Sequence, residues 1–132
     1  MTKKVDSQCH AFQAALEVLG RPWNGLILNV LQAGALRFSE IRARAEGPGD
    51  KILSGRLKDL ELRGLIARHV EPGPPVRVSY ELTASGRQFG DVAQAIQRWG
   101  AVLRATPRIP RRSARKAPPR RRSSARGNAL QR

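Results

Sequence analysis

Residues 50–66 (DKILSGRLKDLELRGLI) combine a leucine stripe with a small, basic opposite face. At about 100° per residue, Leu53, Leu57 and Leu60 fall on one side of a helix over residues 50–63. The candidate binding residues fall on the other side: Lys51, Ser54, Gly55 and Lys58. Small side chains let a helix approach the edges of DNA bases, and lysine reaches phosphates or guanine acceptors. An ordinary solvated helix face has a similar composition, so the flanking elements must decide between these interpretations.

The order of the flanking elements is that of a winged helix-turn-helix domain. Apolar periodicity predicts three earlier helices, over residues 9–19, 23–32 and 38–45. Residues 46–49 (EGPG) cannot continue a helix and predict a tight connection to the basic helix. Alternating segments at 65–70 and 76–82 predict a β-hairpin, the wing, and Thr83 is the predicted N-cap of a long helix ending near Leu103. The predicted fold class is mainly α with a small β-hairpin.

In a domain of this kind the basic helix enters the major groove of DNA and the wing reaches adjacent DNA, which favours DNA contact for the basic face. Ser39 and Arg42 lie on the bracing helix, where contacts go to phosphates and carry no sequence information. Arg77 on the wing is a further predicted contact. Arg56 projects toward the flank of the leucine stripe, which is compatible with a phosphate contact or with an internal ion pair to an acid such as Glu40.

The charge of the chain is unevenly distributed. Lys and Arg number 25 against 10 Asp and Glu, and eleven of the cations lie in residues 104–132, which contain no acid. That segment has too little apolar surface to offset the entropy of ordering. We predict a flexible N-terminus over residues 1–8, one domain over 9–104 and a disordered basic tail over 105–132. A charge excess of this kind indicates a polyanion partner.

The long C-terminal helix carries an apolar seam. Its members are spaced 3, 4, 3 and 4 residues apart: Phe89, Val92, Ile96, Trp99 and Leu103. This spacing is typical of a helix that packs against a partner helix. The alternative is packing within the domain, but Trp99 near the helix end would then be exposed. The seam therefore predicts a dimer.

Several classes of protein are disfavoured. The apolar runs are far shorter than the roughly 20 residues that cross a bilayer, and the N-terminus lacks the apolar region of a signal peptide. A phosphate-binding loop, a dinucleotide fingerprint and an H-E-x-x-H motif are missing, and the two histidines have no acidic cluster beside them. We expect a cytoplasmic, nucleoid-associated protein that is not an enzyme, with no cofactor, no metal site and no membrane partner.

Cys9 is the single cysteine, so an internal disulfide framework is excluded. Such a residue at the start of an apolar helix can be a small buried hydrophobe. It can also be a reactive thiol, because a helix N-terminus or a nearby cation favours the thiolate, and Cys9 would lie in the first turn of a helix over residues 9–19. The sequence leaves both interpretations open.

Five strings together resemble the HxlR-type transcriptional regulators, which are winged helix-turn-helix proteins related to the MarR group. They are Cys9, the LG-x-x-W run at residues 19–23, RFSEI at 37–41, KILSGRLKDLELRGLI at 51–66 and PPVRVSYELTASG at 74–86. The resemblance covers most of residues 9–100. Pro48 and Gly49 stand where the family commonly has Ile and then Ser or Thr, Gly55 replaces a larger side chain, and the arginine tail is outside the family pattern.

The resemblance implies a homodimer that binds an operator of two half-sites and controls neighbouring genes. Dimers of the family pair mainly through their terminal helices, which adds Phe12 and Leu16 to the predicted interface. Several members sense electrophiles or oxidants through an N-terminal cysteine, which Cys9 matches. The resemblance does not specify an effector for this chain.

Two function hypotheses follow. The first is a dimeric, sequence-specific regulator of transcription, more readily a repressor than an activator, whose partners are double-stranded DNA and a second copy of itself. The alternative is a nonspecific nucleic-acid-binding or architectural protein in which the basic tail dominates. Removing residues 105–132 separates them, because it should spare site-specific binding under the first and abolish most binding under the second.

Overall fold

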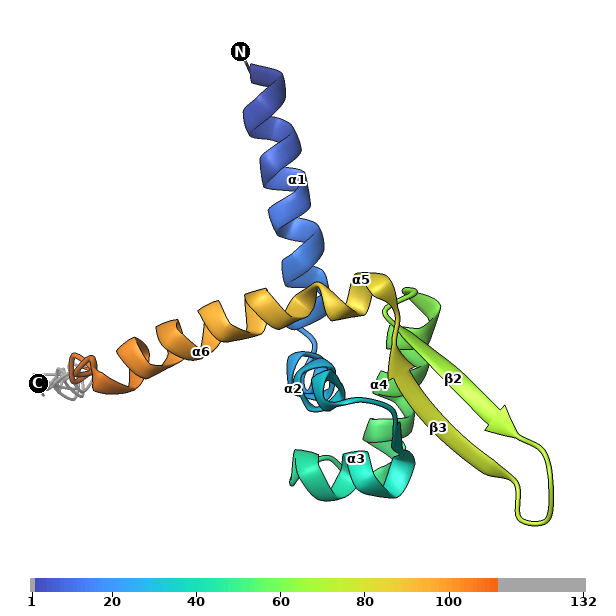
Figure 1. Ribbon diagram of the computed structural model, residues 1–132. Helices are drawn as coiled ribbons and strands as arrows, with labels where there is room; N and C mark the ends of the chain where they lie inside the picture. Colours follow the sequence, from blue (N-terminus) through green and yellow to red (C-terminus); the bar gives the residue numbers. More distant parts are fainter. Residues whose placement is uncertain (1, 112–132) are drawn as a thin grey trace, which may run out of the picture.

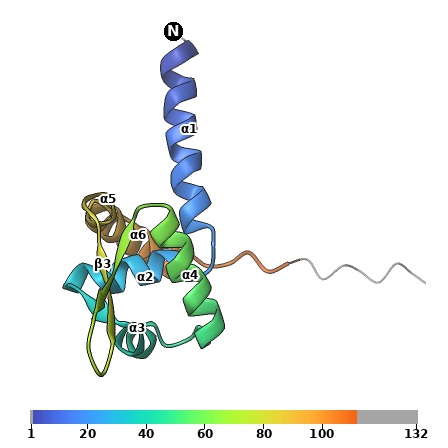
Figure 2. The ribbon, with the colours of Figure 1, turned by 90° about the vertical axis from the view of Figure 1, so that its right-hand side faces the viewer.

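Two long helices extend from a small body in the computed structural model, which describes residues 2–111 (Figure 1). α1 (Thr2–Leu19) rises above the body and α6 (Phe89–Ala105) runs to one side of it. The view turned by 90° again shows α1 standing clear of the other elements (Figure 2). Residues 106–111 are exposed and lie outside helices and strands, and the rest of the predicted tail, residues 112–132, lies outside the described residues.

Three helices and a small sheet form the body. α2 (Asn24–Val30) runs into one 3-10 turn, η1 (Leu31–Ala33). α3 (Phe38–Ala45) and α4 (Asp50–Leu62) follow, within a residue of the bounds that the apolar periodicity predicts. α3 begins where it does because the side chain of Glu40 accepts a hydrogen bond of 3.1 Å from the backbone N–H that precedes the helix.

The turn between α3 and α4 packs against the end of the α1–α2 connection. Glu46 ends α3 in the left-handed conformation, with a φ of 42°. Gly47 lies so close to the indole of Trp23 that a Cβ on Gly47 would overlap the ring. Pro48 is buried, and Gly49 is the N-cap of α4. This confirms the predicted tight connection, which holds the two helices at a fixed distance.

The wing is part of a three-stranded antiparallel sheet. β2 (Ile66–Glu71) and β3 (Arg77–Leu82) form the predicted hairpin, with Ile66 opposite Leu82. β1 (Leu36–Arg37) pairs with the other edge of β3, which gives the order β1-β3-β2. The prediction of a two-stranded hairpin alone was therefore incomplete, because a strand of two residues is too short to leave an alternating pattern.

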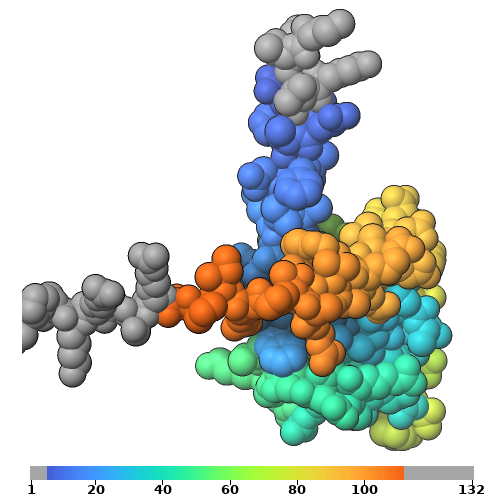
Figure 3. Space-filling view, turned by 90° about the vertical axis from the view of Figure 1, so that its left-hand side faces the viewer, coloured from blue at the N-terminus to red at the C-terminus, as the bar shows by residue number. Residues whose placement is uncertain are grey.

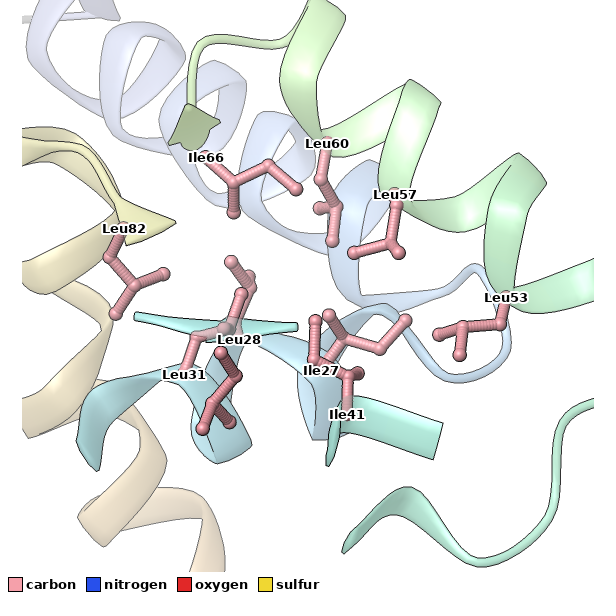
Figure 4. Close-up of a cluster of buried hydrophobic side chains, with 10 residues drawn as sticks. Ile27, Leu28, Leu31, Ile41, Leu53, Leu57, Leu60, Ile66 and Leu82 are labelled. Carbon is pink, nitrogen blue, oxygen red and sulfur yellow. The ribbon is translucent and has the colours of Figure 1, made fainter. Parts of the chain in front are cut away.

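The hydrophobic core lies where α2, α3, α4 and the sheet meet (Figure 4). It consists of Ile27, Leu28, Leu31, Leu36, Ile41, Leu53, Leu57, Leu60, Ile66 and Leu82. The three leucines of α4 are each at most 1% exposed, which confirms the predicted leucine stripe. Their burial turns the opposite side of α4 outward.

Two predicted helix boundaries were wrong. α1 begins at Thr2 rather than at residue 9, because residues 2–8 contain no Gly or Pro that would end a helix. The predicted flexible N-terminus over residues 1–8 is therefore helical from Thr2 onward. Cys9 consequently lies in the middle of α1 and not in its first turn.

The predicted long C-terminal helix is interrupted near its start. Thr83 is the N-cap of a short helix, α5 (Ala84–Arg87), and its Oγ1 accepts a hydrogen bond of 3.2 Å from the backbone N–H of Gly86, as predicted. Gly86 lies against the carbonyl of Leu65 so closely that a Cβ would overlap it. The helix breaks at Gln88, two residues after Gly86, which is a weak helix former, although the backbone of Gln88 keeps right-handed helical angles. α6 therefore starts over the body at Phe89.

Candidate nucleic-acid interface

The outward face of α4 is small and basic. Lys51, Ser54, Gly55 and Lys58 are all exposed, so the predicted binding residues share one solvent-facing side of the helix. A Cβ added to Gly55 would meet no atom within 4 Å, so no protein contact requires a glycine there. The face carries a lysine at each end and small side chains between them, which allows close approach to a DNA groove.

α3 presents its polar residues beside this face. Ser39 and Arg42 are exposed, as predicted for a bracing helix that faces phosphates. Arg42 Nη1 lies 3.0 Å from Asp50 Oδ1, which links α3 to the first turn of α4. Both side chains of this ion pair are more than half exposed, so the pair contributes little stability, and the guanidinium remains accessible to a phosphate.

The wing extends from the body as a hairpin with a proline-rich tip (Figure 1). Arg77 is exposed at the start of β3, close to that tip, and faces Glu71 across the hairpin. Nearer the body, His69 Nε2 lies 3.1 Å from Glu81 Oε2 on the neighbouring strand. Arg77 is thus an exposed cation near the tip of the wing.

Arg56 forms a hydrogen bond within the protein. Its side chain is half-buried, and its Nε donates a hydrogen bond of 2.9 Å to the backbone carbonyl of Pro22. The suggested ion pair with Glu40 was wrong, because the Glu40 carboxylate caps α3 by accepting from Arg37 N–H. We therefore leave Arg56 out of the proposed DNA-contacting set.

A polar cluster behind α4 was not found from the sequence. Asn24 is fully buried, and its Nδ2 donates to Val18 O at 3.0 Å and to Asp59 Oδ2 at 3.4 Å. Asp59 also forms an ion pair of 3.1 Å with Arg63. Burial raises the pKa of Asp59, but hydrogen bonds from Arg63 and Asn24 and the charges of Arg63 and Arg21 outweigh this effect, so the pKa lies below its ordinary value.

An exposed apolar surface follows α1 and α6. It combines four residues of the predicted seam on α6 with the two residues of the predicted interface on α1: Val92, Ile96, Trp99 and Leu103, and Phe12 and Leu16. Phe12 is 65% exposed and Trp99 is 63% exposed, values that are unusual for large apolar side chains. Figure 3 shows α1 projecting from the body, and Figure 1 shows α6 running to one side of it. We call these six residues the apolar seam.

Phe89 departs from the predicted seam. It is half-buried and packs against the core, because the first turn of α6 lies over the body. Two apolar grooves flank it, one of about 300 Å³ that includes Leu26 and Ile96, and one of about 280 Å³ that includes Val18 and Val92. Phe89 therefore lines both grooves, which open beside the apolar seam.

Cys9 is an exposed free thiol. The interpretation as a small buried hydrophobe is therefore wrong for the single chain. The placement in the first turn of a helix is wrong as well, since α1 begins seven residues earlier. The thiol lies on the same projecting helix as Phe12 and Leu16.

In the part of the chain that the structure describes, no helix is long and apolar enough to cross a membrane. Over the same residues, His, Cys, Asp and Glu do not gather into a group that could hold a metal ion.

Comparison with known proteins places this geometry in a family. Residues 18–108 match the HxlR-like helix-turn-helix family. The chain belongs to this family. Two similar proteins of Bacillus subtilis are the HTH-type transcriptional regulators YvaP and YodB. YvaP is 40% identical over 91 residues, covering 69% of this chain and 84% of the relative. YodB is 39% identical over 94 residues, covering 71% and 84%.

Solved structures agree with the HxlR-like assignment. The reduced form of YodB from B. subtilis is 41% identical with a TM-score of 0.61, and the match covers 67% of this chain and 86% of that one. The HTH-type regulator ytcD is 34% identical with a TM-score of 0.67, covering 72% and 97%. The oxidised form of the redox regulator HypR is 26% identical with a TM-score of 0.65, covering 75% and 99%. The predicted winged helix-turn-helix fold and family are confirmed, and the protein is a helix-turn-helix transcriptional regulator.

The polar cluster behind α4 predicts a pH dependence of stability. Because the pKa of Asp59 is lowered by folding, its stabilising effect is present above the ordinary pKa of about 3.9 and is lost as the pH falls through the lower folded value. Urea unfolding at pH 7 and pH 3 should show a smaller pH effect in Asp59→Asn than in the wild type, by about 0.2–1 kcal/mol. Glu61→Gln, an exposed change on the same helix, is the control. Equal pH effects in wild type and Asp59→Asn would contradict the assignment.

Proposed function

We propose that this HxlR-like protein is a homodimeric, sequence-specific DNA-binding regulator that places α4 in the major groove and the wing on adjacent DNA. The observation that carries the proposal is the exposed face of Lys51, Ser54, Gly55 and Lys58, opposite a fully buried leucine stripe. A helix that is fixed in this way presents one defined surface to a groove. Base recognition is assigned to the N-terminal half of the face, at Lys51, Ser54 and Gly55.

The neighbouring contacts are assigned to phosphates. Three exposed polar side chains lie on either side of α4. They are the hydroxyl of Ser39 and the guanidinium of Arg42 on α3, and the guanidinium of Arg77 on the wing. Contacts of this type fix the register of a protein on the duplex without reading its sequence. Lys58, farther along α4, is assigned to the same role.

Dimerisation is supported by the apolar seam on α1 and α6. Residues 6–17 of α1 are all exposed in the single chain, although an isolated helix of this length is only marginally stable in water. A second copy that packs its own seam against this surface would remove Phe12, Trp99 and their neighbours from water. A two-fold dimer would then present two copies of α4 to half-sites about one helical turn of DNA apart, or a multiple of it.

Repression is the proposed mode of action, since occupation of an operator can by itself block a promoter. The proposed signal acts through Cys9. The solved relatives include YodB in reduced, diamide-treated and quinone-bound forms, and HypR in oxidised and reduced forms. Because this chain has one cysteine, a protein disulfide at Cys9 must join two chains. No effector is assigned beyond oxidants or electrophiles as a class.

The alternative function, a nonspecific nucleic-acid-binding or architectural protein, is favoured by one observation, the eleven cations of residues 104–132. Electrostatic binding of this kind does not depend on sequence and weakens steeply with salt. We assign the tail an auxiliary role in holding the regulator near DNA.

The first prediction from the proposed function concerns DNA recognition. We expect the full chain and a version ending at Ala105 both to prefer a duplex that the wild type selects from a random pool over a scrambled duplex. Lys58→Met should reduce the slope of log affinity against log salt by about 1 per bound protomer. Arg98→Met, which removes an exposed cation from α6, is the matched control and should leave the slope unchanged. Binding is measured by fluorescence anisotropy across a salt series.

The truncated protein decides between the two functions. Retained preference at elevated salt supports the regulator. Loss of most binding on truncation, with no preference in either protein, would contradict it and favour the architectural alternative.

The second prediction concerns the dimer. The wild type should sediment at about twice the 14.6 kDa of one chain. Trp99→Glu places a charge in the apolar seam and should give a folded monomer, because Trp99 is 63% exposed and is not needed by the domain itself. Arg98→Glu, one residue away and outside the seam, should remain dimeric. Equal masses for all three proteins in analytical ultracentrifugation would contradict the assigned interface.

The third prediction concerns Cys9. Oxidation by diamide, which accepts two electrons and two protons from two thiols, should link two chains through Cys9 in the wild type. A non-reducing gel should then show a band at twice the chain mass that is missing in Cys9→Ser. If diamide changes DNA affinity equally in both proteins, Cys9 is not the sensor.

A further inference from the structure

The connection between α1 and α2, taken together with Asn24 at the start of α2, contacts the proposed recognition helix and its turn at three levels. At the turn, the indole of Trp23 lies against Gly47. In the middle of α4, Arg56 Nε donates to Pro22 O at 2.9 Å. One turn farther on, Asn24 Nδ2 donates to Asp59 Oδ2 at 3.4 Å. Three consecutive residues, 22–24, thus follow the side of α4 that faces neither the core nor the proposed groove.

The same connection is tied tightly to the end of α1. The backbone N–H of Gly20 donates to Leu16 O at 2.7 Å, and Asn24 Nδ2 donates to Val18 O at 3.0 Å. Trp23 adopts the left-handed conformation with a φ of 74°, so the chain makes a sharp turn there. α1 continues into a short, hydrogen-bonded segment with little freedom to bend.

The side-chain amide of Asn24 forms hydrogen bonds through its nitrogen that link α1 and α4. It is fully buried, its Nδ2 bridges α1 and α4, and its Oδ1 has no hydrogen-bond partner among the described residues. Its two directed donations fix the position of α4 against α1.

We propose that the connection over residues 20–24 sets the position of α4 relative to α1, and that Arg56 and Asn24 are positioning residues for DNA recognition. The inference rests on the proposed function, since α4 must be the element that reads DNA. α1 carries Cys9 and two of the six residues of the apolar seam, and α4 carries the proposed groove face. Arg56 acts through Pro22 and not by touching a phosphate.

The test compares three quantities in full-length variants that are fully folded at the assay temperature by circular dichroism. They are the affinity for a duplex selected by the wild type, the affinity for a scrambled duplex, and the salt slope on each. Arg56→Gln should reduce the ratio of the two affinities roughly tenfold while leaving both salt slopes unchanged. Arg56→Lys, which keeps a long donor, should recover most of the ratio. Asn24→Ala should resemble Arg56→Gln and keeps the test valid if one variant does not fold.

Each of the other possible results would overturn one statement of the proposal or of the proposed function. A fall in salt slope of about 1 per protomer in Arg56→Gln, as expected for Lys58→Met, would make Arg56 a phosphate contact and overturn its positioning role. A lower melting temperature with an unchanged affinity ratio in both Arg56→Gln and Asn24→Ala would reduce the connection to a structural element and also overturn the proposal. A wild type with no preference for any selected duplex would overturn the proposed function itself, which is a separate failure from the first two.

Discussion

The burial of Leu53, Leu57 and Leu60 fixes the rotation of α4 about its own axis, and the rest of the interface depends on it. Each leucine is at most 1% exposed. Turning α4 by half a turn would expose all three, at a cost of roughly 1.5–3 kcal/mol each, and would bury Lys58 against an apolar core. The opposite face is consequently presented in one orientation. A surface held in this way can be complementary to a single arrangement of base edges.

The position of that surface depends on a second set of contacts, which are polar. α3 and the turn after it hold the N-terminal end of α4, and the α1–α2 connection holds its side through Pro22 and Asn24. Hydrogen bonds are directional, whereas the hydrophobic effect is not, so the two sets have different effects. The leucines decide which face is outward, and the polar contacts decide where that face lies relative to α1. The contacts of Pro22 and Asn24 thus connect α1, the helix of the proposed dimer interface, to α4, the proposed recognition helix.

Much of the fold follows from local sequence. Apolar periodicity within each segment, together with the EGPG turn between them, predicted α3 and α4 almost to the residue, because both signals are local in the sequence. β1 has two residues and leaves no periodic signal. The partners of Arg56 and Asn24 lie 34 and 35 residues away along the chain, and such pairings depend on packing that no local pattern encodes. α1 begins in polar residues that carry no apolar period, so the sequence did not predict that Cys9 lies in the middle of this helix.

The central claim is that α4 reads the major groove, and interference by guanine N7 methylation tests it most directly, because that atom faces the major groove. The duplex is one that the wild type selects from a random pool. The account predicts that methylation interferes with binding in two clusters of guanines, about 10 base pairs apart or a multiple of that spacing, on selected DNA. Binding that persists unchanged when every guanine N7 is methylated would contradict it.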